Sequence, residues 1–310
     1  MSTKKPSYFR LLRNAFSEFN SDNATKLSAS LAYSTIFSIG PLLLVVITLT
    51  GLFYKRQAIT QDIEDQLRSL VGNAGAEQIF SILENIQRQS NTTLFGIIGG
   101  IVLLFGTTSV FSEIQSSINY IWSIKAKPKK NWLKFLSDRL LSFSLVVGLG
   151  FLLLVSLLAS AIFELLSSRL VEIFGKFNVV LIHSVDHLLI YFIICMLFAI
   201  IYKVLPDGHI RWKDAFVGAS FTGFLFLIGK FLIGYYLGSS KISNTYGAAA
   251  SIIVVLSWVY YSAAILYFGA EFTKVYALQR GGGIQTKSDA VFIIKRESTE
   301  LFHPDDANKA

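Results

Sequence analysis

The chain alternates between long apolar runs and short polar, mostly basic segments. A helix of roughly 18 or more uncharged residues crosses the ~30 Å hydrocarbon layer of a bilayer, where lipid offers backbone groups no other hydrogen-bond partner. Pro41 is expected to kink the first run without ending it, and the fourth run has a polar beginning. The sequence therefore predicts six transmembrane helices, at about 30–53, 94–113, 140–163, 179–202, 215–237 and 246–270.

Two segments outside these runs also have helical periodicity. Between Tyr8 and Phe19, aromatic and aliphatic residues recur at helical spacing with Arg10 and Arg13 between them, which is typical of a helix lying in the membrane interface; a frayed arm is the alternative. Residues 54–90 carry two apolar patches separated by a GNAG turn and predict two short external amphipathic helices. The expected organisation is an amphipathic arm (1–26), a six-helix membrane domain (27–278) and a flexible tail (279–310).

The distribution of positive charge gives the expected orientation. Six crossings place both termini on one side of the membrane, and 20 of the 28 Lys and Arg residues lie on that side. Seven lie on the opposite side, and Lys230 lies within the fifth span. Because cytoplasmic loops carry the excess of Lys and Arg, both termini are predicted to be cytoplasmic.

Composition agrees with a membrane protein. Hydrophobic residues make up 53% of the chain and charged residues only 15%, whereas a soluble chain averages about a quarter charged residues. The predicted class is therefore an all-α polytopic membrane protein. The net charge of +8 is explained by topology and by attraction to anionic lipid head groups, so we expect no nucleic-acid partner. Cys195 is the only cysteine and forms no internal disulfide.

Two acidic residues end predicted spans on the cytoplasmic side. Glu113 closes the second span and Glu271 the sixth. One interpretation is an interfacial carboxylate paired with a neighbour such as Arg139 or Lys274; the other is that both carboxylates shape a cytoplasmic vestibule. Ionisable groups at membrane depth are functional candidates by default.

Further polar residues lie near the outer side. His183, Asp186 and His187 form an H-x-x-D-H pattern, which fits a hydrated helix entrance, a pH sensor or, less readily because further ligands are missing, a metal site. Lys230 either snorkels outward or pairs with Asp186. We predict neither a metal nor a cofactor. The candidates for a substrate pathway are Glu113, Asp186, His187, Lys230 and Glu271.

Several short motifs, in order, resemble one family. They are LAYSTIFSIGPLLLVV from Leu31, the NYIW element from Asn119, Leu205-Pro206 before Trp212, Tyr246-Gly247-Ala248, Trp258 and Gly269-Ala270-Glu271. From about residue 10 to 278 the chain resembles the YihY/virulence factor BrkB family of bacterial inner-membrane proteins. The positions that match its pattern are Tyr33, Pro41, Asn119, Pro206, Gly247, Trp258 and Glu271.

The resemblance implies an all-helical domain in the bacterial inner membrane. Members of the family have carried a ribonuclease BN label, a link to virulence and serum resistance, and suggestions of envelope lipid transport. A ribonuclease would need clustered metal ligands or a His-based acid–base pair on the cytoplasmic side, and this sequence has neither. We therefore expect a protein that is not an enzyme.

Three functional hypotheses remain open. The first is a transporter or translocation factor for an envelope lipid or another amphipathic substrate. The second is a membrane scaffold or subunit in envelope biogenesis, and the third is a channel or small-solute exporter. The expected partners are membrane lipids, with a homo-oligomer or other envelope proteins as further alternatives.

Overall fold

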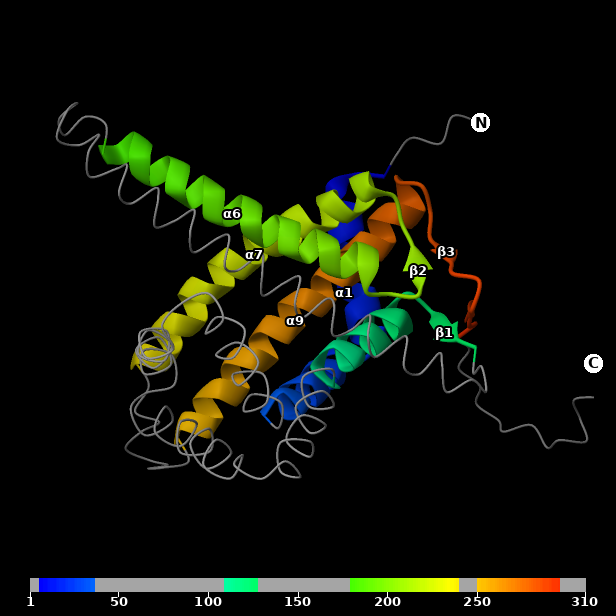
Figure 1. Cartoon of the computed structure of the whole chain (residues 1–310), viewed down its shortest axis with the longest axis horizontal. Helices are drawn as coiled ribbons and strands as arrows, with labels where there is room; N and C mark the ends of the chain where they lie inside the picture. The colour runs from blue at the N-terminus through cyan, green and yellow to red at the C-terminus, as the bar shows by residue number, and fades with distance from the viewer. Residues whose placement is uncertain (1–5, 37–108, 128–178, 240–249, 296–310) are drawn as a thin grey trace, which may run out of the picture.

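Three long helices form the centre of the molecule. The computed structural model describes residues 6–36, 109–127, 179–239 and 250–295. The long helices are α6 (Val179–Val204), α7 (Trp212–Ser239) and α9 (Ala250–Gln279). Helix α7 packs against both α6 and α9, as Figure 1 shows. The chain is mostly helical, in agreement with the predicted class.

Two of these helices have the length and composition needed to cross a membrane. They are Trp212–Ile233 within α7 and Ile253–Gln279 within α9, and residues Leu188–Val204 of α6 form a shorter apolar stretch. Only 28% and 33% of the most apolar windows of α7 and α9 are buried within the protein. The core helix of a soluble protein would be mostly buried, so the exposed apolar faces favour a lipid environment.

The helices extend beyond the predicted spans at two points. Helix α9 continues to Gln279, nine residues past the expected end at 270, and Glu271 and Lys274 pair with each other within this last part of the helix. A helix covering described residues 109–121 likewise continues past Glu113, the expected end of the second span. The predicted span 140–163, the external segment 54–90 and Pro41 lie outside the described residues.

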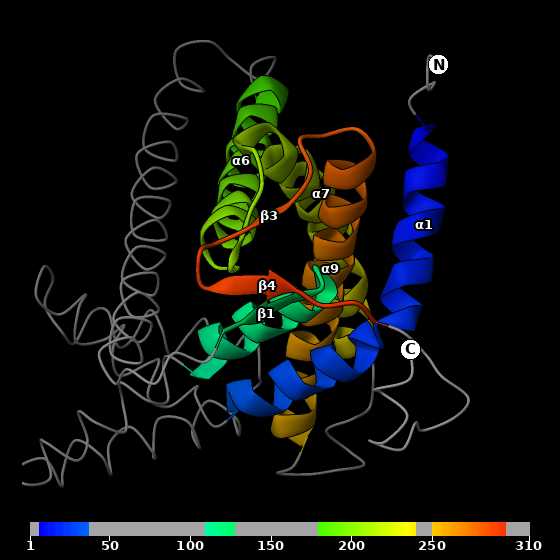
Figure 2. The same ribbon diagram turned by 90° about the vertical axis from the view of Figure 1, so that its right-hand side faces the viewer.

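The N-terminal arm folds back along α9. Helix α1 (Tyr8–Ser21) ends in a tight turn in which Asn23 has a φ of 52°, a conformation that Asn tolerates, and a second helix follows over residues 24–36. Leu11 and Ala15 of α1 are buried in one apolar cluster with Phe272 and Val275 of α9. The predicted amphipathic helix is therefore present, with one apolar face held against α9 (Figure 2).

Two short antiparallel ribbons join the end of the chain to loops between helices. Strand β1 (Ile124–Ala126) pairs with β4 (Ala290–Phe292), and β2 (Gly208–His209) pairs with β3 (Gln285–Thr286). Figure 2 shows β4 crossing beside β1 at the end of the helices. The prediction of a flexible tail from residue 279 is wrong for residues 285–292, because their backbone groups pair with these loops; residues 296–310 lie outside the described part of the chain.

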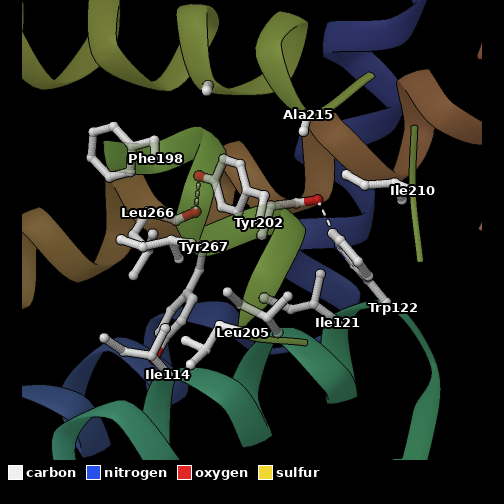
Figure 3. Close-up of a cluster of buried hydrophobic side chains, with 14 of the residues drawn as sticks. Ile114, Ile121, Trp122, Phe198, Tyr202, Leu205, Ile210, Ala215, Leu266 and Tyr267 are labelled. Carbon is white, nitrogen blue, oxygen red and sulfur yellow. Dashed lines mark hydrogen bonds between the residues drawn. The ribbon is translucent and has the colours of Figure 1, made fainter. Parts of the chain in front are cut away.

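Four distant segments meet at one end of the molecule. The ribbons join the segment after Trp122 and the α6–α7 loop to the segment after α9, and the arm joins them through its contacts with α9 and the Asp22–Lys295 ion pair. The distribution of positive charge predicts that these same four segments lie on one side of the membrane. Their contacts explain why the main core lies here, around Trp122, Tyr202, Leu205 and Tyr267, all with at most 2% exposure (Figure 3).

Tyr202 joins three helices within this core. Its hydroxyl donates to the Leu266 carbonyl at 2.8 Å (Figure 3). The same hydroxyl lies 3.0 Å from Thr222 Oγ1. We expect Tyr202→Phe to lower the free energy of unfolding by about 1 kcal/mol, the usual net value of a buried hydrogen bond. Thermal unfolding in detergent measures this, with the exposed Tyr260→Phe as the matched control. Equal unfolding midpoints for the two variants would contradict the assigned role.

Helices α7 and α9 approach closely through a reciprocal pair of small residues. A Cβ atom added to Gly218 would overlap Thr273, and one added to Gly269 would overlap Thr222. Each threonine lies four residues after a glycine and donates to that glycine's carbonyl, Thr222 to Gly218 at 2.8 Å and Thr273 to Gly269 at 2.7 Å. Small residues at i and i+4 let helix backbones pack closely in membranes.

Candidate functional site

A cluster of charged side chains lies where α1, α9 and the C-terminal segment meet. Glu18 is near the end of α1, Asp22 follows that helix, and Glu271 and Lys274 lie one turn apart on α9. Lys295, beyond β4, completes the group. We call these five residues the carboxylate cluster.

Lys274 occupies the middle of the carboxylate cluster. Its Nζ lies 2.9 Å from Glu18 Oε2, 3.3 Å from Glu271 Oε2 and 3.7 Å from Asp22 Oδ2. Lys295 Nζ lies 2.7 Å from the other oxygen of Asp22, Oδ1, and 3.8 Å from the centre of the Tyr120 ring. The cluster therefore ties α1 and the C-terminal segment to α9 through charged contacts.

Burial differs sharply among these groups. The side chain of Glu271 is 0% exposed, that of Asp22 6% and that of Lys274 11%, whereas Glu18 is 46% exposed. Removing charges from water is costly, and replacing one partner leaves an uncompensated charge behind. Such a cluster is therefore weak support for stability but a strong candidate for function.

The three carboxylates have the spacing of a cation site. One oxygen from each of Glu18, Asp22 and Glu271 lies within 4.8 Å of the others. The Lys274 ammonium group already contacts all three carboxylates. A lysine ammonium thus occupies the position that a metal ion would take, and we assign no metal to this cluster.

A second polar group joins the helix at 109–121 to the α6–α7 loop. Asn119 Nδ2 donates to Asp207 Oδ2 at 2.8 Å, and the Asp207 backbone N–H donates to Asn119 Oδ1 at 2.8 Å. Gln115 adds longer contacts of 3.4 and 3.5 Å to the same carboxylate. We call the reciprocal pair the Asn119–Asp207 clamp; Pro206, which precedes Asp207, is buried.

The residues proposed for a substrate pathway do not all come together. Glu113 is half-buried and accepts a hydrogen bond from Ser30 Oγ at 2.6 Å; Arg139, one of the basic partners suggested by the sequence, lies outside the described residues. Glu271 does pair with Lys274, as one interpretation of the sequence predicted. Lys230 is exposed on α7. The side chains of Asp186 and His187 lie outside the described set, so the Lys230–Asp186 pair stays a prediction.

The positions that match the family pattern have different surroundings. Asn119 is buried in the clamp, Trp258 is half-buried on α9, and Tyr33 is 66% exposed. Pro41 and Gly247 lie outside the described residues.

Sequence reasoning missed Glu18, Asp22 and Lys295 as members of the carboxylate cluster. For α1 a usable signal was present, because Glu18 and Asp22 continue the helical row of the buried Leu11 and Ala15. For Lys295 no signal was available, because its place depends on the pairing of β4 with β1.

The apolar helices, with charge concentrated at one end of the bundle, define an integral helical membrane protein. The family model described as Virulence factor BrkB matches residues 15–292, and the chain belongs to this family. The match confirms the resemblance noted in the sequence and extends it past 278 to include both C-terminal strands.

Curated relatives are named as membrane proteins. A UPF0761 membrane protein of Tolumonas auensis is 27% identical over 255 residues, which cover 81% of this chain and 80% of the relative. A UPF0761 membrane protein of Aeromonas salmonicida is 28% identical over 264 residues, covering 83% and 86%. No solved structure matches the chain.

Proposed function

We propose that the protein moves an anionic amphipathic lipid across the bacterial inner membrane. In this proposal both termini face the cytoplasm, because the excess of Lys and Arg lies on the segments that meet at the ribbon end of the molecule. The lipid class follows from the charge of the surface at which it would enter. The role is not enzymatic, since the sequence supplies no catalytic constellation.

The observation that carries the proposal is the outer face of α1. Phe9 is 78% exposed and Phe16 59% exposed, although the opposite face of the same helix is buried against α9. Phe9, Arg10, Arg13 and Ser7 line a shallow hollow of about 270 Å³. Aromatic side chains suit the acyl boundary, and arginine guanidinium groups bind phosphate in a bidentate manner.

The position of this face beside α9 suggests how it acts. Helix α9 has the length of a membrane crossing, and α1 is fixed to its end by apolar contacts and by the carboxylate cluster. A head group held by Arg10 and Arg13 would therefore lie at the border of the membrane-spanning helices. This is the place where an anionic lipid enters a translocation path.

The test uses the full chain in proteoliposomes of defined composition. Movement of fluorescent phosphatidylglycerol between leaflets is measured by its accessibility to a membrane-impermeant quencher, with phosphatidylcholine as the neutral comparison. We expect Arg10→Ala/Arg13→Ala to slow the anionic lipid about 30-fold, since each basic residue near an anionic surface contributes about 1 kcal/mol and the two changes together remove about 2 kcal/mol. Lys125→Ala/Lys127→Ala removes the same charge from exposed residues at the same end and is the matched control. Equal rates with and without protein would refute the proposal.

A membrane scaffold is the second candidate. It is favoured by the exposed apolar residues around β4, where Phe292 is 53% and Ile294 81% exposed. A scaffold requires no lipid movement by the isolated chain, and its function would survive neutralisation of Lys230, Asp186 and Glu113. The proteoliposome assay with these three variants separates the two candidates.

A further inference from the structure

Two buried carboxylate oxygens in the carboxylate cluster lack a hydrogen-bond donor among the described residues. They are Asp22 Oδ2 and Glu271 Oε1. Their side chains are 6% and 0% exposed, so bulk water does not supply the missing donor. An unsatisfied buried acceptor costs about 1–3 kcal/mol, and more when it is ionised. Both oxygens therefore point to something that the carboxylate cluster binds.

The charges of the carboxylate cluster do not balance. Its ion pairs bring the two ammonium groups of Lys274 and Lys295 to three carboxylates. Full ionisation would leave one negative charge in a site where two of the three carboxylates are buried. The ligand that fits carries one positive charge.

The space left among the three carboxylates decides which positively charged ligand fits. Lys274 Nζ already contacts Glu18, Asp22 and Glu271, so no further metal ion fits among the three carboxylates. A proton needs no additional volume. Placed between two carboxylates, it makes one of them a donor and satisfies the acceptor on the other.

We propose that Asp22 and Glu271 bind one proton between them, as a carboxylic acid whose O–H donates to the neighbouring carboxylate. This single proton neutralises the excess charge and gives both orphan oxygens a partner. Glu18 is the outermost of the three carboxylates: its side chain is half exposed and lies 2.9 Å from Lys274. The proton belongs to the pair rather than to either residue alone.

Proton binding controls how firmly α1 is held on α9. Asp22 directly follows α1 and Glu271 lies on α9, so loss of the proton places two like charges across this contact. The charged groups facing the pair are Glu18 from α1, Lys274 from α9 and Lys295 from the C-terminal segment. The folded state then holds one proton more than the unfolded chain at neutral pH, so stability falls as pH rises.

Infrared spectroscopy of the purified full chain tests the proposal. The carboxylic acid C=O band should be present at neutral pH and disappear as pH rises. Glu271→Gln and Asp22→Asn should each remove it, whereas Asp289→Asn, a carboxylate-to-amide change near β4, should leave it. Glu18→Gln removes the excess negative charge, and proton binding should weaken about tenfold. A wild-type band that survives both Glu271→Gln and Asp22→Asn, or its absence at neutral pH, overturns the proposal.

Hydrogen exchange provides a second readout in case a variant folds poorly. In the wild type, opening of α1 should increase as pH rises, after correction for the intrinsic exchange rate. Glu271→Gln imitates the protonated form and should keep α1 protected across the same range. The same pH dependence in both proteins would overturn the proposal. Neither measurement requires lipid movement, so a negative transport assay and a negative proton assay remain distinguishable.

Discussion

Asn119→Asp is expected to lower the free energy of unfolding by about 3 kcal/mol, because the new carboxylate is a poorly solvated charge without a partner. Asn119 Nδ2 donates to Asp207 Oδ2 at 2.8 Å in a largely buried setting. The substitution replaces that donor by a second carboxylate and leaves two negative oxygens at hydrogen-bond distance. Thermal and denaturant unfolding in detergent measure the loss.

Exchanging the two side chains of the Asn119–Asp207 clamp should restore stability. In Asn119→Asp/Asp207→Asn the amide and the carboxylate exchange places, and the backbone N–H of residue 207 still has an acceptor in the side chain at 119. We expect the double variant to recover most of the stability lost in Asn119→Asp. A double-mutant cycle gives the coupling energy, and additive losses would show that the two side chains do not interact.

Gly218→Ala and Gly269→Ala are expected to separate α7 from α9, each lowering the free energy of unfolding by about 2 kcal/mol. The new methyl group would lie 2.8 Å from Thr273 Cβ in the first case and 2.8 Å from Thr222 Cγ2 in the second, besides overlapping their hydroxyls. These contacts are between well-packed helices, so the backbones must move apart. The unfolding midpoint and the amount of protein in the membrane should both fall.

The same helix provides the matched control. Gly223→Ala brings its methyl group no closer than 3.0 Å to the Cys195 sulfur, and alanine favours a helix over glycine by about 1 kcal/mol, so we expect little change. Adding Thr273→Ala to Gly218→Ala removes the overlapping hydroxyl and should restore part of the stability. Equal effects of Gly218→Ala and Gly223→Ala would contradict the close crossing.

Periodicity predicted the type and approximate position of α6, α7 and α9, because uncharged runs of this length have few alternatives to a helix. It failed at the end of α9, where the charge of Glu271 was expected to end the span, because Glu271 is buried and pairs with Lys274 one turn further along the same helix. Periodicity failed again in the tail. The two strands there, Gln285–Thr286 and Ala290–Phe292, are too short to show an alternating pattern. They form only by pairing with loops that are distant in the sequence.

The candidate site was predictable only in part. Glu271 and Lys274 are three residues apart on one helix, so local spacing is enough to pair them. Asp22 is separated from Glu271 by most of the chain, and only the packing of α1 along α9 brings them together. The glycine–threonine crossing had a visible i, i+4 signal at Gly218 and Thr222, but its partners on α9 follow only from the packing of α7 against α9.

The two ribbons affect how the protein is made. Strands β1 and β2 emerge from the ribosome long before β4 and β3, their partners, are synthesised. The backbone groups of β1 and β2 therefore have no strand partner until β3 and β4 have been synthesised. A chain truncated upstream of Ala290 would have its membrane helices but would lack the β1–β4 ribbon.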